Sequence, residues 1–262
     1  VVGIDTPRYL KALRSANATT CQSLAIDLEN LSHLAQRHLQ MKEYSPPILI
    51  GYSSGATLAY ATLVQSPPGT FSGAMSLGFC ADQDIGEAQL CPGYGLKYTR
   101  NRRGDAVFEP ASHLRQPWLA FQGQQDEVCK PAAIDAFVTE VAGAAVVRLP
   151  KVGHGFSVQR NWMPQFRAAY RTIVDRTQAE GKPIPVAIQD LPVTEVAADN
   201  RSSKQFALLL TGDGGWAGLD QDVSARLAAL GTPVVGFNSL KYFWTQRTPE
   251  QTAVDVARVL RH

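Results

Sequence analysis

The chain lacks the features that mark membrane-spanning and nucleic-acid-binding proteins. No apolar run in the sequence approaches the roughly 20 residues that a membrane helix needs. The net charge is only +2 over 262 residues, and basic side chains do not gather with aromatic ones, so we expect no nucleic acid partner. The hydrophobic content of 45% is enough to fill a core. These properties predict a globular protein.

Cysteine is scarce, and its spacing does not indicate a metal site. The four cysteines form no C-x2-C pair, and no histidine lies close to two of them in the sequence, so we expect no metal and no other cofactor. Cys80 and Cys91 flank a polar loop and are the first candidates for a disulfide, which would suit an oxidising compartment. A pair of Cys21 with Cys129, or four free thiols, are the alternatives.

An internal repeat is present and predicts how the chain is organised. VVGFNSLKYF at 234–243 repeats VVGIDTPRYL at 1–10, and AVDVARV at 253–259 follows it as AIDLENL at 25–31 follows the first copy. The repeat begins inside a unit, and the sequence starts without a methionine. We therefore expect a first unit that has lost its front and a second that has lost its back.

The boundaries follow from the repeat and from composition. We predict a first unit over 1–180 and the N-terminal part of a second, similar unit over 206–262. Residues 181–205 are rich in proline and polar side chains without a helical period, and we interpret them as a linker.

Short β-branched runs alternate with helical patterns, which predicts an α/β fold with a mostly parallel sheet and helices on both faces. The expected strands are VVGID, ILIGYS, FSGAMSLGF, PWLAFQG, AVVRLP, FALLLTG and PVVGFNS. The expected helices cover about 22–40, 131–143, 162–178 and 219–230. Two more begin at about 54 and 249, and Thr248 is the expected cap of the last one.

The segment ILIGYSSGATLAYATL raises the question of a nucleophile. Ser53 follows a strand, precedes a helix and lies between Gly51 and Gly55, which is the context of a serine exposed on a sharp strand-to-helix turn. The N–H of Ser54, at the helix N-terminus, is an expected oxyanion donor. Because a serine hydroxyl needs a base and the base needs a carboxylate, the chain should supply both after Ser53.

Two later strands end in suitable residues. Asp126 follows PWLAFQG, and His154 lies between glycines after AVVRLP, so the chain order is Ser, Asp, His, as in α/β hydrolases. We predict Ser53 as nucleophile, His154 as base and Asp126 as the acid that orients it. The rival acids are Glu127, Asp82 and Asp84, and the less suitably placed histidines are His33, His38, His113 and His262.

These segments together resemble a known family. GYSSGATLAYA, FQGQQDEVC, LPKVGHGFSVQRNW, LLLTGDGGWAGLDQDV and PVVGFNSLKYFWTQRTPE are similar to the tandem VirJ/AcvB family of bacterial virulence-associated proteins, over nearly the whole chain. The resemblance implies a periplasmic pair of α/β-hydrolase-like units that release the amino acid, lysine, from aminoacylated phosphatidylglycerol. It also implies that the lipid hydrolase activity is associated with the C-terminal unit, whose own Ser, acid and His would lie beyond His262.

The resemblance gives further expectations about the site. The strand at 206–211 could fill a gap beside the strand that ends at Ser53, and would bring Gly214 and Gly215 close as oxyanion donors. Tyr52 is expected to contact substrate, and an aminoacyl ammonium would need an acidic neighbour such as Asp82, Asp84 or Glu87. Expected partners are a lipid or small ester, a membrane surface and secretion-system proteins. The alternatives are a generic small-ester hydrolase and a non-catalytic virulence-associated binding module.

Overall fold

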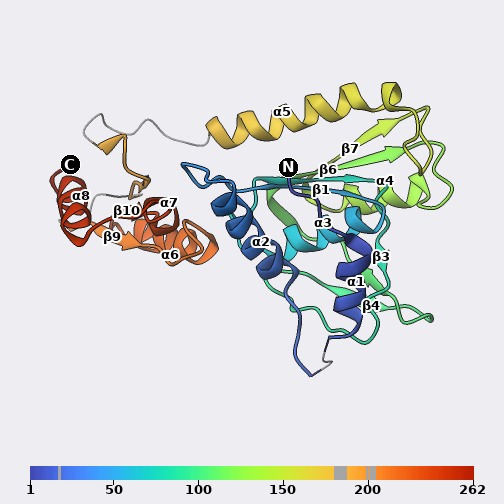
Figure 1. The fold of residues 1–262 in the computed structure, drawn as a ribbon, viewed down its shortest axis with the longest axis horizontal. Coiled ribbons are helices and arrows are strands. Elements are labelled where there is room, and N and C mark those ends of the chain that lie inside the picture. The colour runs from blue at the N-terminus through green and yellow to red at the C-terminus, as the bar shows by residue number, and fades with distance from the viewer. Residues whose placement is uncertain (17–18, 180–187, 199, 201–204) are drawn as a thin grey trace. The chain divides into compact units, whose positions relative to one another are not determined.

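The computed structural model describes residues 1–16, 19–179, 188–198, 200 and 205–262 (Figure 1). These residues form two units. Unit 1 comprises Val1–Ala35 and Pro47–Asp175, and unit 2 comprises Gln36–Pro46 and Arg176–His262. No described helix combines the length and apolar character required to span a bilayer.

The main sheet of unit 1 has four parallel strands in the order β1-β2-β6-β7 (Figure 1). The strands are β1 (Ile48–Tyr52), β2 (Gly73–Leu77), β6 (His113–Gly123) and β7 (Ala142–Leu149). Because all four run in the same direction, their carboxyl ends meet at one edge of the sheet. The predicted α/β class is confirmed.

Helices cover both faces of this sheet. On one face, α3 (Ser54–Gln65) and α4 (Pro131–Thr139) pack on Trp118 and Ala120 of β6. On the other, Phe121 packs with Ile173 of α5 (Met163–Ala179). Alternate residues of one strand thus enter the two cores, as the period of two along a strand requires. A short 3₁₀ helix, Gln159–Asn161, precedes α5.

A small antiparallel sheet was not predicted. It has the order β3-β5-β4, with β3 at Asp82–Gln83, β4 at Tyr98–Arg100 and β5 at Ala106–Phe108. Strands of this length are too short to show a period in the sequence. This sheet occupies the stretch between β2 and β6.

Two disulfides are present, Cys21–Cys91 and Cys80–Cys129. The predicted Cys80–Cys91 pair is therefore wrong, as are the alternatives of a Cys21–Cys129 pair and of free thiols. Such bonds persist in oxidising environments, which indicates a compartment outside the cytoplasm.

The reason for this pairing is tertiary. Gln22 and Leu90 form an isolated parallel bridge, which places the cysteines next to them 4.9 Å apart between their Cα atoms. Cys80 follows β2 and Cys129 follows β6, and these strands are neighbours in the sheet, with Cα atoms 5.3 Å apart. Closeness in the sequence was a poor guide to closeness in the fold.

The predicted strand at 1–5 is wrong. Val1–Asp5 pairs with no strand among the described residues, and the chain enters α1 (Thr6–Arg14), where the Asp5 carboxylate accepts a hydrogen bond from the Arg8 N–H. The predicted helix over about 22–40 is present as α2 (Leu24–His38).

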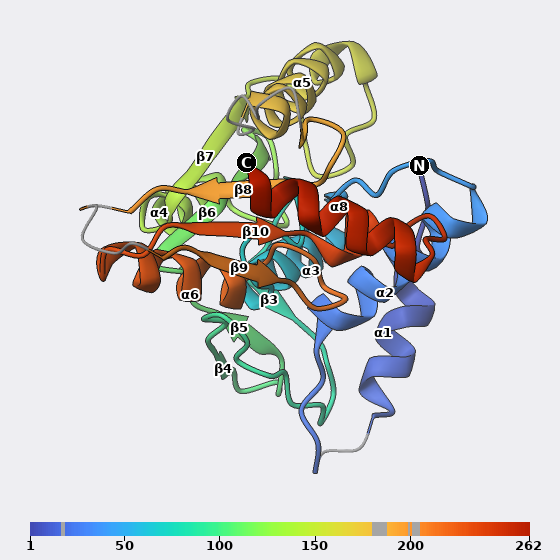
Figure 2. The same cartoon turned by 90° about the vertical axis from the view of Figure 1, so that its left-hand side faces the viewer.

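Unit 2 contains a three-stranded sheet in the order β8-β10-β9 (Figure 2). Its strands are β8 (Val193–Val196), β9 (Ala207–Leu210) and β10 (Val234–Phe237), and its helices are α6 (Gly218–Ala229), α7 (Ser239–Tyr242) and α8 (Pro249–Arg261). β10 is parallel to β9 and antiparallel to β8. Thr248 caps α8 as predicted, since its hydroxyl accepts a hydrogen bond from the Gln251 N–H.

Part of the expected linker is folded. Residues 193–196 form β8, and Ile188, Leu191 and Val193 are buried in the core of unit 2. Residues 181–187, 199 and 201–204 of that stretch lie outside the described residues. The expected position of β9 beside β1 stays a prediction.

Candidate active site

The turn between β1 and α3 carries Ser53 in a strained conformation. Its φ is 53° and its ψ is −123°, a region that residues with a side chain rarely adopt. A Cβ on Gly51 would lie 1.9 Å from the Gly55 carbonyl oxygen, so the sharp turn requires glycine at position 51. A Cβ on Gly55 would meet only Thr6 Oγ1, at 3.6 Å, an ordinary contact. Of the two glycines that flank Ser53, only Gly51 is therefore required by a collision.

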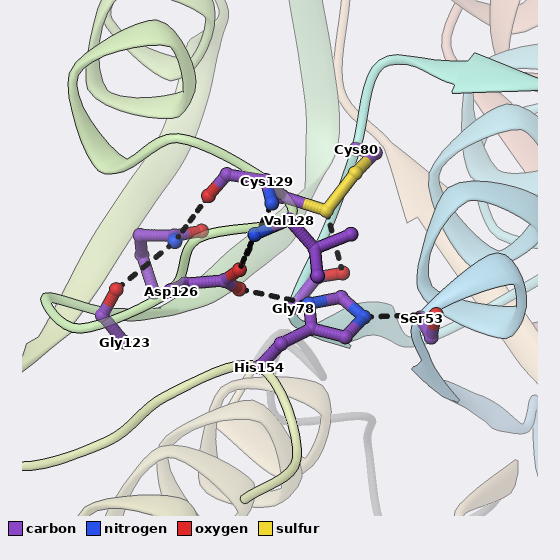
Figure 3. Close-up of polar contacts among 9 residues, drawn as sticks. Ser53, Gly78, Cys80, Gly123, Asp126, Val128, Cys129 and His154 are labelled. Atoms are coloured by element: carbon purple, nitrogen blue, oxygen red, sulfur yellow. Dashed lines mark hydrogen bonds and ion pairs between the residues drawn. A yellow bond between two sulfur atoms is a disulfide. The ribbon is translucent and has the colours of Figure 1, made fainter.

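The structure brings the three predicted side chains together at the carboxyl edge of the sheet (Figure 3). His154 Nε2 lies 3.1 Å from Ser53 Oγ, and His154 Nδ1 lies 2.9 Å from Asp126 Oδ2. With the carboxylate accepting from Nδ1–H, Nε2 is left as an acceptor for the serine hydroxyl proton. This geometry allows proton transfer from the serine to the imidazole.

Asp126 is buried, with 3% of its surface exposed. Its other carboxylate oxygen, Oδ1, accepts hydrogen bonds of 2.9 Å from the N–H groups of Val128 and Cys129. A carboxylate that accepts two N–H bonds and faces an imidazole is fixed in orientation. Asp126 can thus hold the ring of His154 in one tautomer and stabilise its protonated form.

His154 is packed against residues from two other strands. Gly78, just after β2, has a φ of +62°, and a Cβ there would lie 3.2 Å from His154 Cε1. The ring centroid of Tyr52 is 5.8 Å from that of His154. Tyr52, predicted to contact substrate, therefore lies beside His154 and is half exposed. Its contact with substrate stays a prediction.

Possible oxyanion donors lie in different parts of the chain. Ser54 is the first residue of α3, so its N–H has no acceptor within the helix and adjoins Ser53. Gly214 and Gly215 belong to unit 2, where a Cβ on Gly215 would lie 3.0 Å from Asn238 Oδ1. The role of these two glycines as donors stays a prediction.

The acidic candidates for an ammonium group have their own surroundings. Asp84 forms an ion pair with Arg14 at 3.1 Å and accepts a hydrogen bond from the Gly86 N–H at 2.9 Å. Asp82 lies exposed on β3. The ion pair counts against Asp84 as the partner of a second cation, whereas the carboxylate of Asp82 is exposed to solvent.

The rival residues do not occupy the triad positions. Glu127 is exposed next to Asp126, and His262 lies in unit 2, 3.0 Å from a Glu195 carboxylate oxygen. His33 and His38 lie in α2, and His113 begins β6. Among the described residues, His154 is the histidine whose ring reaches Ser53.

Asp126, Cys129 and His154 form a cluster of residue types that can bind a metal ion, with their ligand atoms within 4.8 Å of one another. The Cys129 sulfur, however, is covalently bonded to Cys80, and Asp126 and His154 are hydrogen-bonded to each other. A metal ligand from cysteine is a thiolate, which this sulfur cannot provide while the disulfide is intact. The donor set therefore does not fit a metal ion.

Sequence reasoning missed the residues that support the triad. Gly78 makes room for the imidazole, and Gly123 allows the close approach of β6 to the Val152 carbonyl oxygen, which a Cβ would meet at 2.3 Å. Cys80 and Cys129 join the ends of two strands. The signal in the sequence for these residues is weak: a glycine and a cysteine come at or shortly after the ends of both β2 and β6.

Parallel strands that present Ser, Asp and His in this chain order, with the serine on a strand–turn–helix, define an α/β-hydrolase type of fold and site. Residues 204–262 match the family described as Bacterial virulence protein (VirJ), which confirms the resemblance over that stretch. Comparison with curated proteins gives no match.

Several solved structures with a similar arrangement have titles that name a hydrolase or an esterase. They include a YdeN-like hydrolase from Pectobacterium atrosepticum (18% identity, 56% of this chain and 70% of that chain, TM-score 0.37). Est1E from Butyrivibrio proteoclasticus (12%, 56% and 67%, 0.37) and esterase 2 from Thermogutta terrifontis (13%, 61% and 66%, 0.38) are others. Similarity at this level carries no argument about activity.

Proposed function

We propose that this protein is a serine hydrolase that cleaves a carboxylic ester. The observation that carries the proposal is the hydrogen-bonded series Ser53, His154, Asp126, with the serine on a strained turn before a helix. In the proposed reaction, Ser53 Oγ attacks the ester carbonyl while His154 takes its proton. The imidazolium then protonates the leaving alkoxide, and the Ser54 N–H stabilises the oxyanion. Water, activated by His154, hydrolyses the acyl-enzyme.

For the substrate, we propose the aminoacyl ester of aminoacylated phosphatidylglycerol, lysyl-phosphatidylglycerol above all, in the periplasm. The resemblance to VirJ/AcvB sequences and the match at residues 204–262 support this choice. The two disulfides suit a periplasmic setting. The acyl group would be the amino acid, whose ammonium could approach the exposed carboxylate of Asp82.

The test compares the parent protein with Ser53→Ala on two substrates, lysyl-phosphatidylglycerol in vesicles and p-nitrophenyl acetate. We expect Ser53→Ala to lower kcat by about 10³-fold or more on both, since the nucleophile acts as a unit with its base. Ser157→Ala, which removes an exposed hydroxyl near His154, is the control. A fluorophosphonate should label the parent at Ser53 and leave Ser53→Ala unlabelled.

Each alternative function has its own outcome in this experiment. Turnover of p-nitrophenyl acetate without release of lysine from the lipid would support a generic small-ester hydrolase. Absence of turnover and of labelling in the parent would overturn the enzyme proposal and favour a non-catalytic binding module. Equal turnover by Ser53→Ala and the parent would remove Ser53 from the mechanism.

A further inference from the structure

The Cys80–Cys129 disulfide lies beside the triad (Figure 3). Cys129 is linked to the acid turn through its backbone, because its N–H donates to Asp126 Oδ1 at 2.9 Å and its carbonyl accepts from Gln122 Nε2 at 3.0 Å. Its sulfur is 3.7 Å from the Gly78 carbonyl oxygen. The half-cystine thus touches both the acid turn and the strand end that borders the imidazole.

Cys80, the other half of the bond, is tied to the nucleophile helix. Its carbonyl accepts a hydrogen bond of 2.8 Å from the Thr57 hydroxyl on α3, and Ser53 immediately precedes this helix. The disulfide therefore connects the segment at Cys80, which is hydrogen-bonded to α3, with the turn that carries Asp126. Hydrogen bonds also hold the acid turn, and Val128 within it is 67% exposed.

We propose that the Cys80–Cys129 disulfide is a positioning element for Asp126, so that full activity depends on its oxidised state. The inference rests on the proposed ester hydrolysis. When a dithiol reductant cleaves the bond, one of its thiolates attacks one cysteine sulfur, forms a mixed disulfide with it and releases the other cysteine as a thiolate. The second thiolate of the reagent then displaces the cysteine held in the mixed disulfide. The protein gains two thiols and the reagent becomes a cyclic disulfide, with two electrons transferred. The turn of Asp126 then keeps its hydrogen bonds and loses its covalent tie to Cys80.

The second disulfide supplies a matched control. Cys21–Cys91 is in the same unit and closes a longer loop, with a sequence separation of 70 against 49, but Cys21 and Cys91 make none of the contacts described for the triad. The test compares Cys80→Ala/Cys129→Ala with Cys21→Ala/Cys91→Ala on p-nitrophenyl acetate. The quantity measured is kcat per active site, with the sites counted by titration with a fluorophosphonate. Titration removes the effect of any unfolded fraction.

We expect Cys80→Ala/Cys129→Ala to lower kcat per site by about tenfold to a hundredfold, the effect of a small misplacement of a catalytic group, with little change in KM. Cys21→Ala/Cys91→Ala should keep the parent kcat per site while lowering the thermal midpoint. A parent-like kcat in Cys80→Ala/Cys129→Ala, or equal losses in both double variants, would overturn the inference.

A double-mutant cycle separates the positioning of Asp126 from a general loss of rigidity in unit 1. If the disulfide acts through Asp126, its removal in an Asp126→Asn background should cost little further activity, because coupled residues give non-additive effects. Multiplicative losses would contradict the proposal.

Should Cys80→Ala/Cys129→Ala fail to fold, the Cys21→Ala/Cys91→Ala variant retains only the disulfide in question. Dithiothreitol should lower its kcat per site, and reoxidation should restore it; unchanged activity after complete reduction overturns the inference. A parent protein without Ser53-dependent turnover overturns the proposed function as well, whereas an active parent that is insensitive to loss of the bond overturns only the positioning role.

Discussion

At the scale of single residues, the geometry of the site depends on glycines that lack a Cβ as much as on Ser53, Asp126 and His154. Gly51 lacks the Cβ that would strike Gly55, and this permits the turn that exposes Ser53. Gly78 lacks the Cβ that would press on the ring of His154 at 3.2 Å from Cε1 and 3.3 Å from Nδ1. The nitrogen affected is the one that binds Asp126.

We therefore predict that Gly78→Ala impairs activity more than stability explains. The added methyl must displace the imidazole by a few tenths of an ångström, and misplacement of this kind costs about tenfold to a hundredfold in kcat. Gly104→Ala is a matched control, because Gly104 also has a positive φ, of 90°, but has nothing within 4 Å of its added Cβ. Both variants should lose about 1 kcal/mol of stability from backbone strain. Equal kcat values per titrated site in the two variants would contradict this account.

The triad could be predicted from the sequence because each member follows a recognisable strand. Ser53, Asp126 and His154 needed only strand ends, chain order and the chemistry of a serine nucleophile. The supporting residues could not be predicted in this way, since the requirement for glycine at position 78 comes from a ring contributed by a loop much later in the chain. The disulfide partners likewise depend on strand order, which the sequence does not display.

At the scale of elements, the sequence repeat is matched by a repeated hydrogen bond. Tyr9 donates to Asp27 in unit 1, and the equivalent Tyr242 donates to Asp255 in unit 2, both at 2.8 Å. The helix caps are repeated too, because the Asp5 side chain accepts from the Arg8 N–H and the Asn238 side chain accepts from the Lys241 N–H. The repeat therefore encodes a helix start and a tyrosine tie to the next helix, α2 or α8.

We predict that Tyr242→Phe destabilises unit 2 by about 1–2 kcal/mol, and that Tyr9→Phe costs unit 1 less than about 1 kcal/mol. The difference arises because Tyr242 is 1% exposed, whereas Tyr9 is only partly buried and its partner Asp27 is exposed. Chemical denaturation of each variant, followed segment by segment by hydrogen exchange, measures the two losses. A larger loss for Tyr9→Phe would show that burial does not set the strength of this bond.

The same tyrosines predict a dependence on alkaline pH. Burial, and then the hydrogen bond to aspartate, raises the pKa of the Tyr9 phenol, and burial likewise raises the pKa of Tyr242. A folded pKa above the unfolded value of about 10 means that this stabilisation is complete below pH 10 and is lost as pH rises toward the folded pKa. The two phenylalanine variants should therefore lose less stability than the parent protein above pH 10.

The first copy of the sequence repeat also shows where a strand-like sequence fails to predict a strand. Val1–Asp5 and Val234–Phe237 have nearly the same residues, yet only the second segment forms a strand, because β8 and β9 flank it. A strand is defined by its ladder partners, and the described residues offer none to Val1–Asp5. Long helices such as α5 were predictable because their apolar period persists over several turns.

At the scale of the whole molecule, the covalent cross-links are distributed unevenly. All four cysteines lie in unit 1, where the disulfides close sequence separations of 70 and 49. Unit 2 contains no cysteine and relies on its own core and on polar ties such as the Arg258 contacts with Asp190 and Asp255. Oxidation therefore stabilises one unit directly and leaves the other to noncovalent forces.

Complete reduction should accordingly act on unit 1 alone. A disulfide stabilises mainly by restricting the unfolded chain, by about 2–5 kcal/mol for each native bond removed. Native-state hydrogen exchange in dithiothreitol should therefore show faster exchange for the amides of β2 and β6, while the amides of β10 keep their protection. A variant with all four cysteines replaced by alanine is the control, because its exchange should not respond to the reductant. Equal loss of protection in β10 and β6 would mean that the two units unfold as one body, and unchanged exchange in β2 and β6 would mean that the hydrophobic core alone sets the stability of the sheet that carries Ser53.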